Sequence, residues 1–409
     1  MSLLQERPTA DTPTADDLVA SARALRDRLR ELQPEHAKLG TYSPEIHEAF
    51  KDARLYDILR PKKYGGLELG LETFFRVAVE ISRGDPAVGW SWELGASHAY
   101  QFASHWPEEA QAKAFESYPF ISASRAFPQK ADATKVDGGY RLTGRWDYNS
   151  GCTYSTHFMP VALIDQEDGS KKPYMFILPR KDFTIIDDWG EGRTIGLHAS
   201  SSNSIEIDDA FVPDYDVVPF NFKDIEWGTE GTPGYQLHHN PLYLGRTSAI
   251  FIAGLTQTMV GAALASLDEY ERLMERGSSF PPRIPRSESP EYQLWYGKIV
   301  SLADSSQTLL LAAVREFEER NQAWVDGGPE FTTADDVRIR GQVVQSAKLA
   351  QEAIELAFTT AGTTSAALAG TKLGKYYLDA AMYRTHIGAQ HDVLLASLGR
   401  VLLGQALTM

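Results

Sequence analysis

Three histidines lie in segments whose residue types could carry acid–base chemistry. His386 and His391 belong to the segment 383–392, which reads Tyr-Arg-Thr-His-Ile-Gly-Ala-Gln-His-Asp, and His98 belongs to Gly-Ala-Ser-His-Ala-Tyr at 95–100. An unperturbed imidazole has a pKa near neutrality, so each ring could accept or donate a proton at physiological pH. The plainer interpretation of each is an ordinary core or surface histidine.

Several other catalytic patterns are missing from the sequence. It has no P-loop, zinc signature or nucleophile elbow, and its single cysteine, Cys152, cannot build a disulfide framework or a metal site alone. The glycines at 190, 192 and 196 come nearest to a dinucleotide fingerprint. Their last spacing is one residue too long, and a strand is expected to follow where the fingerprint needs a helix. We therefore expect a loop there, and neither a nicotinamide site nor a metal site.

Three regions with different hydrophobic periods must position these residues. Residues 1–14, rich in Pro, Thr and Asp, are expected to be a mobile tail. Residues 15–118 have helical spacing, and Ser43-Pro44 is a typical helix start. Residues 119–232 predict a β-domain, with a hairpin turn at 136–140 and strands at 174–178, 183–186 and 204–207.

Residues 233–409 predict long helices. The sequence Thr333-Ala-Asp-Asp336 resembles a capping box, and the helix after it keeps one apolar face. Gly254 and Gly261, seven residues apart on another helix, would let a neighbouring helix approach closely. Helices and strands segregated in this way favour an α+β fold that is mostly α, not an alternating βαβ sheet.

Composition excludes some classes of partner. The 409 residues contain 43 % hydrophobic residues and carry a formal net charge of −15. An acidic surface disfavours nucleic acid and anionic lipid as partners. We found no signal-peptide pattern and no uncharged apolar run approaching the roughly 20 residues of a membrane span.

Four segments resemble the acyl-CoA dehydrogenase superfamily and occur in the order found in that family. They are Ala-Arg-Leu-Tyr-Asp-Ile-Leu-Arg-Pro-Lys-Lys-Tyr-Gly-Gly-Leu-Glu-Leu at 53–69, Glu-Ile-Ser-Arg-Gly-Asp-Pro-Ala-Val-Gly-Trp at 80–90, Tyr-Arg-Leu-Thr-Gly-Arg-Trp-Asp-Tyr-Asn-Ser-Gly at 140–151, and Ile-Glu-Ile-Asp-Asp-Ala-Phe-Val-Pro at 205–213. The resemblance covers roughly residues 15–405. It implies an N-terminal helical domain, a central β-domain and a C-terminal four-helix bundle, assembled as a homotetramer.

Within that superfamily, the sequence resembles the two-component monooxygenases more than the dehydrogenases. Dehydrogenases commonly carry Tyr-Glu-Gly-Thr before the last helix, whereas no glutamate stands in the segment 383–392. Glu269 and Glu271, near another family position for a base, are interpreted as a solvated helix face. The Arg-Thr-His stretch is similar to hydroxyphenylacetate, phenolic-steroid and dibenzothiophene oxygenases. Their Ser-Ser-Gly is matched by Asn149-Ser150-Gly151, with Asn at the first position.

The resemblance implies a function as the oxygenase component of a flavin monooxygenase. Reduced flavin, FMNH₂ or FADH₂, would react with O₂ to give a C4a-hydroperoxide that oxygenates an aromatic or heteroatom-containing small molecule. Ser150 would hold this intermediate near flavin N5. His386 is the first candidate acid or base and His391 the second, and His98 resembles a histidine on the substrate side.

The resemblance also suggests binding residues. Expected flavin contacts from the β-domain are Ser122, Ser124, Asn149, Ser150 and Gly151. A small polar segment near a helix end, which a neighbouring subunit could supply, is expected to add Gly362, Thr363 and Ser365. Aromatic side chains that would border the substrate pocket are Trp90, Trp92, Tyr100, Phe127 and Trp146.

Without a nicotinamide site, the enzyme would depend on a separate NAD(P)H:flavin reductase, and we expect it in the cytoplasm. Two alternatives remain open. An acyl-CoA dehydrogenase with a relocated base would bleach bound oxidised flavin when given an acyl-CoA. A non-catalytic flavin-binding or scaffold protein would use the same fold without turnover, and a protein without a flavin site would gain no thermal stability from flavin.

Overall fold

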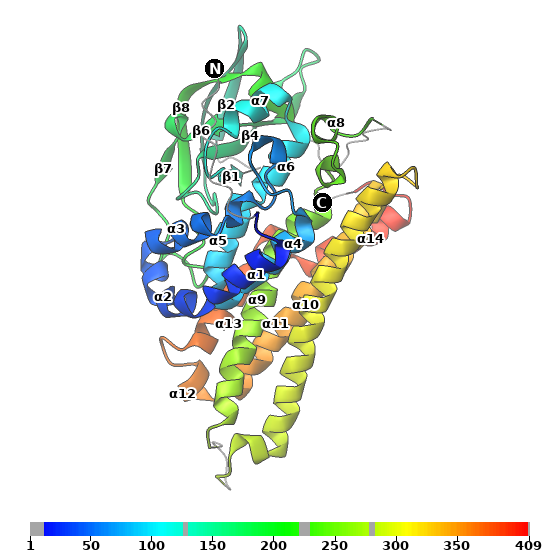
Figure 1. Cartoon of the computed structure of the whole chain (residues 1–409). Helices are drawn as coiled ribbons and strands as arrows, with labels where there is room; N and C mark the ends of the chain where they lie inside the picture. The colour runs from blue at the N-terminus through cyan, green and yellow to red at the C-terminus, as the bar shows by residue number, and fades with distance from the viewer. Residues whose placement is uncertain (1–11, 126–129, 221–229, 278–282, 408–409) are drawn as a thin grey trace.

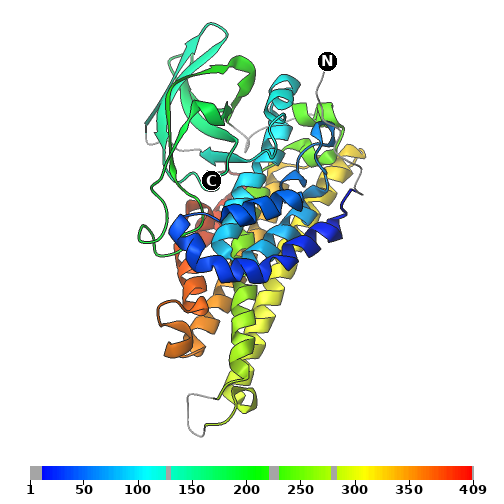
Figure 2. The same ribbon diagram turned by 60° about the vertical axis from the view of Figure 1, so that its left-hand side comes forward.

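The computed structural model describes residues 12–125, 130–220, 230–277 and 283–407, and consists of a long helical body with a β-domain at one end (Figures 1 and 2). Thr14, at the end of the expected tail, caps the first helix through a capping box with Asp17. The N-terminal part contains α1 (Ala15–Ala24), α2 (Arg26–Leu39), α3 (Pro44–Asp52), α4 (Gly70–Gly84), α5 (Pro86–Ala96), α6 (His98–His105) and α7 (Glu108–Ala114). Ser43 caps α3, as the sequence predicts.

The β-domain has two sheets with a small hydrophobic core between them. The first sheet contains β1 (Ser122–Arg125), β4 (His157–Asp165), β5 (Lys171–Phe176), β6 (Leu178–Pro179) and β9 (Val217–Pro219). The second contains β2 (Lys130–Val136), β3 (Gly139–Trp146), β8 (Ser204–Pro213) and β7 (Thr184–Ile186). β2 and β3 form the predicted hairpin, with Val136 opposite Gly139. The predicted strands are therefore confirmed.

The C-terminal part contains α8 (Pro233–His238), α9 (Ser248–Met274), α10 (Pro290–Val325), α11 (Thr333–Thr360), α12 (Thr363–Ala366), α13 (Lys372–Tyr383) and α14 (His391–Leu402). α9, α10 and α11 pack on one another, α13 packs on α9 and α11, and α14 packs on α11. Two shorter helices thus complete the bundle of three long ones. One hydrophobic core joins these helices to the N-terminal helices.

α9 corrects the expectation about apolar runs. Its length and mean hydropathy of 1.7 would suffice to cross a membrane, but 94 % of that apolar window is buried inside the protein, as in the core helix of a soluble protein. Gly254 and Gly261 permit this burial. A Cβ at Gly254 would lie 2.2 Å from Glu93 Oε1, and a Cβ at Gly261 would lie 2.3 Å from Ser82 Cβ. The predicted close helix approach is confirmed at both positions.

The capping box of α11 lies one residue earlier than the sequence predicts. Thr332 and Asp335 form the reciprocal pair. Asp336, which the sequence analysis included in the box, instead accepts the backbone N–H groups of Ser248 at 3.0 Å and Ala249 at 2.8 Å. It therefore caps the start of α9, satisfying donors that a helix N-terminus leaves without partners.

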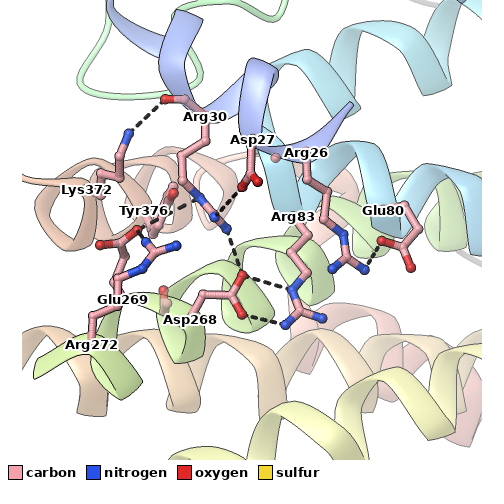
Figure 3. A network of polar contacts seen from close by, with 12 residues as sticks. Arg26, Asp27, Arg30, Glu80, Arg83, Asp268, Glu269, Arg272, Lys372 and Tyr376 are labelled. Carbon is pink, nitrogen blue, oxygen red and sulfur yellow. Dashed lines mark hydrogen bonds and ion pairs between the residues drawn. The ribbon is translucent and has the colours of Figure 1, made fainter. Parts of the chain in front are cut away.

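An ion network fastens α2 and α4 to the middle of the bundle (Figure 3). Asp268 of α9 accepts from Arg30 of α2 at 2.7 Å and from Arg83 of α4 at 3.0 Å. Glu269 pairs with Arg272 and Arg30, and its side chain is only 18 % exposed. Glu269 is thus part of this network, which corrects its interpretation as a solvated helix face.

Candidate active site

Helix α5 lies where the three parts of the chain meet. Asp85 caps it by accepting the N–H of Ala87 at 3.1 Å, and Pro86 fixes the first turn. The helix packs against α4, α9 and β1. Successive residues of an α-helix are about 100° apart, so neighbouring positions of α5 face different parts of the protein.

The turn 149–151 rests directly on α5. Gly151 has φ +76, and a Cβ there would lie 2.6 Å from Ser91 O and 2.9 Å from Gly95 N. Only glycine meets both requirements, the left-handed backbone and the close approach. The turn is therefore held against the face of α5 that carries Ser91 and Gly95.

Asn149 explains the one departure from the Ser-Ser-Gly pattern. Its side chain is fully buried, and its Nδ2 donates to the carbonyls of Trp146 and Asn203, the latter at 2.9 Å. These bonds tie the end of β3 to the start of β8. Among the residues that the structure describes, Asn149 Oδ1 has no hydrogen-bond partner. Asn149 thus fixes the turn, and it leaves one buried acceptor unused.

Ser150 begins a chain of three hydroxyl groups. Its Oγ lies 2.7 Å from Ser202 Oγ, which lies 2.7 Å from Ser200 Oγ. Ser150 is partly exposed, whereas Ser200 and Ser202 are buried. Three hydroxyls have three protons and use two of them within the chain, so one donor remains for a further acceptor. This donor set, with no side chain at Gly151, fits the polar edge of a flavin ring.

His98, the first residue of α6, is buried and oriented by β1. Its Nδ1 lies 2.6 Å from the carbonyl of Ser122, so Nδ1 carries the proton and Nε2 is the acceptor of the neutral ring. Burial lowers the pKa of His98 to about 4, although the carbonyls of Ser122 and Leu94 partly offset this effect. His98 therefore presents a hydrogen-bond acceptor at neutral pH. Ser122 is itself fully buried, and Ser124 is partly exposed at the end of the same strand.

His386 contacts Trp90 of α5 from the far end of the chain. The two rings meet edge to face, with centroids 5.4 Å apart and planes at 76°. His386 Nδ1 accepts the N–H of Gly388 at 3.0 Å, so the neutral ring carries its proton on Nε2. Gly388 packs on Leu255 of α9 and has no room for a side chain. His386 thus has the opposite tautomer to His98.

Glu93 is a buried acid that sequence reasoning missed. Its side chain points at Gly254 of α9, and Oε2 has no hydrogen-bond partner among the described residues. Burial raises the pKa of Glu93 to about 8, against a small opposing effect of Ser97. The carboxyl is therefore protonated at neutral pH. The available signal was a single acidic residue within the apolar sequence of α5.

Two predicted pocket residues belong to the hydrophobic cores. Trp92 is fully buried and stacks on Phe74 with centroids 4.9 Å apart. It projects about 200° around α5 from Trp90, into the N-terminal helices. Trp146 lies in the core between the sheets and donates Nε1–H to Val161 O at 3.1 Å. Packing therefore accounts for both side chains, and Trp90 is the aromatic residue that faces His386.

The remaining predicted residues lie elsewhere. Tyr100 donates its hydroxyl to the carbonyl of Arg246 at 2.7 Å. His391 lies at the start of α14, where Nδ1 pairs with the fully exposed Asp392 at 2.8 Å. The predicted flavin contacts around α12, which are Gly362, Thr363 and Ser365, lie in the half of the helical body away from the β-domain (Figures 1 and 2). Phe127 lies outside the described residues.

The glycine-rich stretch at 190–196 forms the expected loop. A Cβ at Gly196 would lie 2.4 Å from Leu378 O of α13, so this stretch packs its backbone against a helix side. The next element along the chain is the strand β8, so the expectation that a strand and not a helix follows these glycines is confirmed.

Comparisons with known proteins agree with this architecture. The acyl-CoA dehydrogenase N-terminal domain matches residues 12–116, and the acyl-CoA dehydrogenase C-terminal domain matches residues 253–391. A solved structure of the HsaA monooxygenase from M. tuberculosis has a TM-score of 0.85 at 19 % identity, covering 97 % of this chain and 99 % of that chain. XiaF from Streptomyces sp., solved with FADH2 and glycerol, has a TM-score of 0.83 at 22 % identity and covers 97 % of each chain.

Relatives at the sequence level are hydroxylases. A pigment production hydroxylase of Rhodococcus sp. (strain ATCC 21145) is 30 % identical over 297 residues, which are 70 % of this chain and 74 % of that protein. The oxygenase component of an FADH(2)-dependent resorcinol hydroxylase of Rhizobium sp. (strain MTP-10005) is 26 % identical over 363 residues, or 87 % and 86 % of the two chains. The chain therefore belongs to the acyl-CoA dehydrogenase family, in its branch of flavin-dependent hydroxylase and monooxygenase oxygenase components.

Proposed function

We propose that the chain is the oxygenase component of a two-component monooxygenase that hydroxylates a small aromatic substrate. The observation that carries this proposal is the pair of histidines held in opposite tautomers around α5. His98 carries its ring proton on Nδ1 and His386 carries its ring proton on Nε2, and the turn packed on α5 offers the hydroxyl of Ser150. A hydroxylase needs these groups to orient a phenol-like substrate and the oxygen that it receives.

This turn would hold a reduced flavin, whose two electrons would activate O₂ for the transfer of one of its oxygen atoms. Ser150 and the backbone of Gly151 would hold its polar edge, and the β1 residues Ser122 and Ser124 would lie alongside. His386 Nε2–H would donate a hydrogen bond to the transferred oxygen. His98 Nε2 would accept the proton of a substrate hydroxyl in a hydrogen bond, because its low pKa makes it a weak base. The ring of Trp90 would provide an apolar surface that excludes water.

Replacing Ser150 with alanine tests the hydroxyl chain. We expect reduced flavin on the Ser150→Ala variant to reoxidise about ten times faster than on the wild type, because one well-placed hydrogen bond contributes roughly 1–1.5 kcal/mol. The measurement is stopped-flow absorbance of protein loaded with FADH₂ or FMNH₂ and mixed with O₂. Ser155→Ala is the matched control, since Ser155 follows the same turn and its hydroxyl donates to Cys152 O instead of to the serine chain. Equal rates in both variants would remove Ser150 from the flavin contact.

The proposal includes a separate NAD(P)H:flavin reductase and a cytoplasmic location, where reduced flavin can be supplied. Relatives named as oxygenase components support the reductase.

We also propose a homotetramer formed through the C-terminal helices. Leu294, Val393 and Leu402 are about half exposed on those helices, which favours burial in an interface. In a tetramer, the segment 362–365, which lies in the half of the helical body away from the β-domain, could meet the flavin of a neighbouring subunit (Figures 1 and 2).

An acyl-CoA dehydrogenase is the second candidate, supported by the family models alone. It needs an ionised carboxylate as base, whereas Glu93 is protonated at neutral pH and Glu269 is occupied by arginines. Anaerobic addition of an acyl-CoA to protein with oxidised flavin separates the two functions. Bleaching of the flavin would support the dehydrogenase. A scaffold without a flavin site would show no rise in melting temperature with flavin.

A further inference from the structure

A buried ion cluster connects α5, α13 and the loop that begins at Leu197. Lys375 of α13 donates to Asp85 Oδ1 at 2.9 Å and to Asp379 Oδ2 at 2.7 Å. Both carboxylates are buried, with side chains 0 % and 2 % exposed, while that of Lys375 is 24 % exposed. His36 Nδ1 lies 3.3 Å from the other oxygen of Asp85. Burial works against the charge on Lys375, but Asp379 and Asp85 outweigh it and raise the pKa of the ammonium.

Each partner of Lys375 leads to one side of the site. Asp85 is the N-cap of α5, the helix that presents Trp90 and supports the turn at Gly151. Asp379 Oδ1 accepts the N–H of Leu197 at 2.7 Å. Leu197 opens the loop that ends in Ser200 and Ser202, the hydroxyls bonded to Ser150.

The loop from 197 to 202 depends on such external anchors. Leu197 and Ser201 have φ +52 and +53, a backbone conformation that costs free energy for residues other than glycine. Surrounding contacts must therefore hold it. Asp379 holds Leu197, and the carbonyl of Gly40 accepts the N–H of Ser201 at 2.8 Å.

The third connection runs along α13 itself. This helix ends at Tyr383, whose ring lies 6.2 Å from that of Trp90, and His386 follows three residues later. One turn earlier than Lys375, Lys372 donates to the carbonyl of Arg30 at 2.8 Å, so α13 is also fastened to α2 (Figure 3). Any shift of α13 would thus move His386 relative to Trp90.

We propose that Lys375 is a positioning residue for the site. Through Asp379 it positions the loop that carries Ser200 and Ser202, and through α13 it positions His386. Its bond to Asp85 fixes both relative to α5. This inference rests on the proposed function for its catalytic consequence. Lys375 does not itself touch substrate or flavin. It ties α5, α13 and the loop at 197–202 together at one point, so that Ser150 and His386 keep a fixed separation.

Two variants test this role by different means. Lys375→Met removes the ammonium, and Lys375→Arg should restore part of its effect. Gly196→Ala leaves every charge in place but adds a Cβ 2.4 Å from Leu378 O, which pushes the loop away from α13. Arg83→Met is the matched control, because Arg83 is 25 % exposed and also pairs with a largely buried aspartate between two helices. Within the described residues, the side-chain hydrogen bonds of Arg83 go to Asp268 of α9, not to Asp85, Asp379 or the loop at 197–202.

Hydrogen exchange of the flavin-free protein gives the first measurement. We expect the amides of residues 197–202 to exchange at least about ten times faster in Lys375→Met and Gly196→Ala than in the wild type, and at the wild-type rate in Arg83→Met. Stopped-flow reoxidation of FADH₂ or FMNH₂ gives the second, with a rise of about tenfold in the same two variants, since small displacements of catalytic groups are costly.

The inference is overturned if Lys375→Met and Gly196→Ala lose thermal stability yet keep wild-type exchange in this loop, as expected for Arg83→Met. Should Lys375→Met fail to fold, Lys375→Arg takes its place: exchange in this loop faster than in the wild type supports the positioning role, and wild-type exchange overturns it. Exchange is measured without flavin, so it tests the positioning role independently. It would do so even if flavin reoxidised at the same rate with wild-type protein as without protein. That last result would count against the proposed function only.

Discussion

Replacing His386 with alanine is expected to lower product formation about 100-fold while oxygen consumption continues. The ring is held against Trp90, and Nδ1 is fixed by the N–H of Gly388, so its donor is oriented before substrate binds. General acid–base groups typically contribute two to four orders of magnitude to rate, and the lower figure suits a hydrogen-bond donor. Oxygen would then be released as H₂O₂, because the flavin still reacts with O₂ but the transfer fails.

The measurement is the ratio of hydroxylated product to H₂O₂ with a phenolic probe that the wild type converts, chosen from resorcinol and p-hydroxyphenylacetate. His391→Ala provides the matched control. Its ring is paired with Asp392 and Gln345 on the surface, so the ratio should stay at the wild-type value. A His386→Ala enzyme with an unchanged ratio, or a His391→Ala enzyme with a collapsed one, would transfer the role to another residue.

Glu93→Gln is expected to remove a strong pH dependence of stability. The native carboxyl keeps its proton up to about pH 8, whereas an unfolded glutamate loses it near 4.5. The contribution of Glu93 to the free energy of unfolding is therefore fully present below pH 4.5. It is lost as the pH rises towards 8, because only the unfolded state releases the proton in that range. Each pH unit in that window costs about 1.4 kcal/mol, so the loss between pH 5 and pH 8 is on the order of 3–4 kcal/mol.

Glutamine has the same shape and stays neutral, so the variant should gain stability over the wild type as the pH rises. Denaturant unfolding of the flavin-free protein at pH 5, 6, 7 and 8 gives the free energy of unfolding against pH for the wild type and the variant. The amide could change the variant's stability by the same amount at every pH, and this would not affect the difference between the two slopes. Glu109→Gln, on the exposed side of α7, serves as the control and should keep the wild-type slope. Parallel curves for Glu93→Gln and the wild type would show that Glu93 is ionised in the native protein.

Much of the architecture could be predicted because it rests on local patterns. Ser43-Pro44, the 136–140 hairpin and the spacing of Gly254 and Gly261 each specify a turn or a contact from neighbouring residues. The capping box of α11 was misplaced by one residue because Thr332 and Thr333 both suit an N-cap. The choice depends on Asp336, which contacts a distant helix.

The site was less predictable because it depends on which face of a helix meets which partner. Trp90 and Trp92 have the same chemistry in sequence, and only the packing of α5 separates a site residue from a core residue. Asn149 reads as a departure from a flavin contact, but its amide is a structural tie to Asn203. Glu93 and Lys375 each contact a residue more than 100 positions away in the chain. The periodicity of the sequence does not predict such contacts.

The central claim is that this chain holds reduced flavin so that its reaction with O₂ is controlled by the protein. Anaerobic protein with FADH₂, and separately with FMNH₂, should be mixed with oxygenated buffer in a stopped-flow spectrophotometer. We predict a transient absorbing species, distinct from both reduced and oxidised flavin, that persists before the oxidised spectrum appears. The flavin, FADH₂ or FMNH₂, that gives the longer-lived species is the one that the protein uses. Immediate appearance of oxidised flavin, at the rate found without protein, would contradict the account.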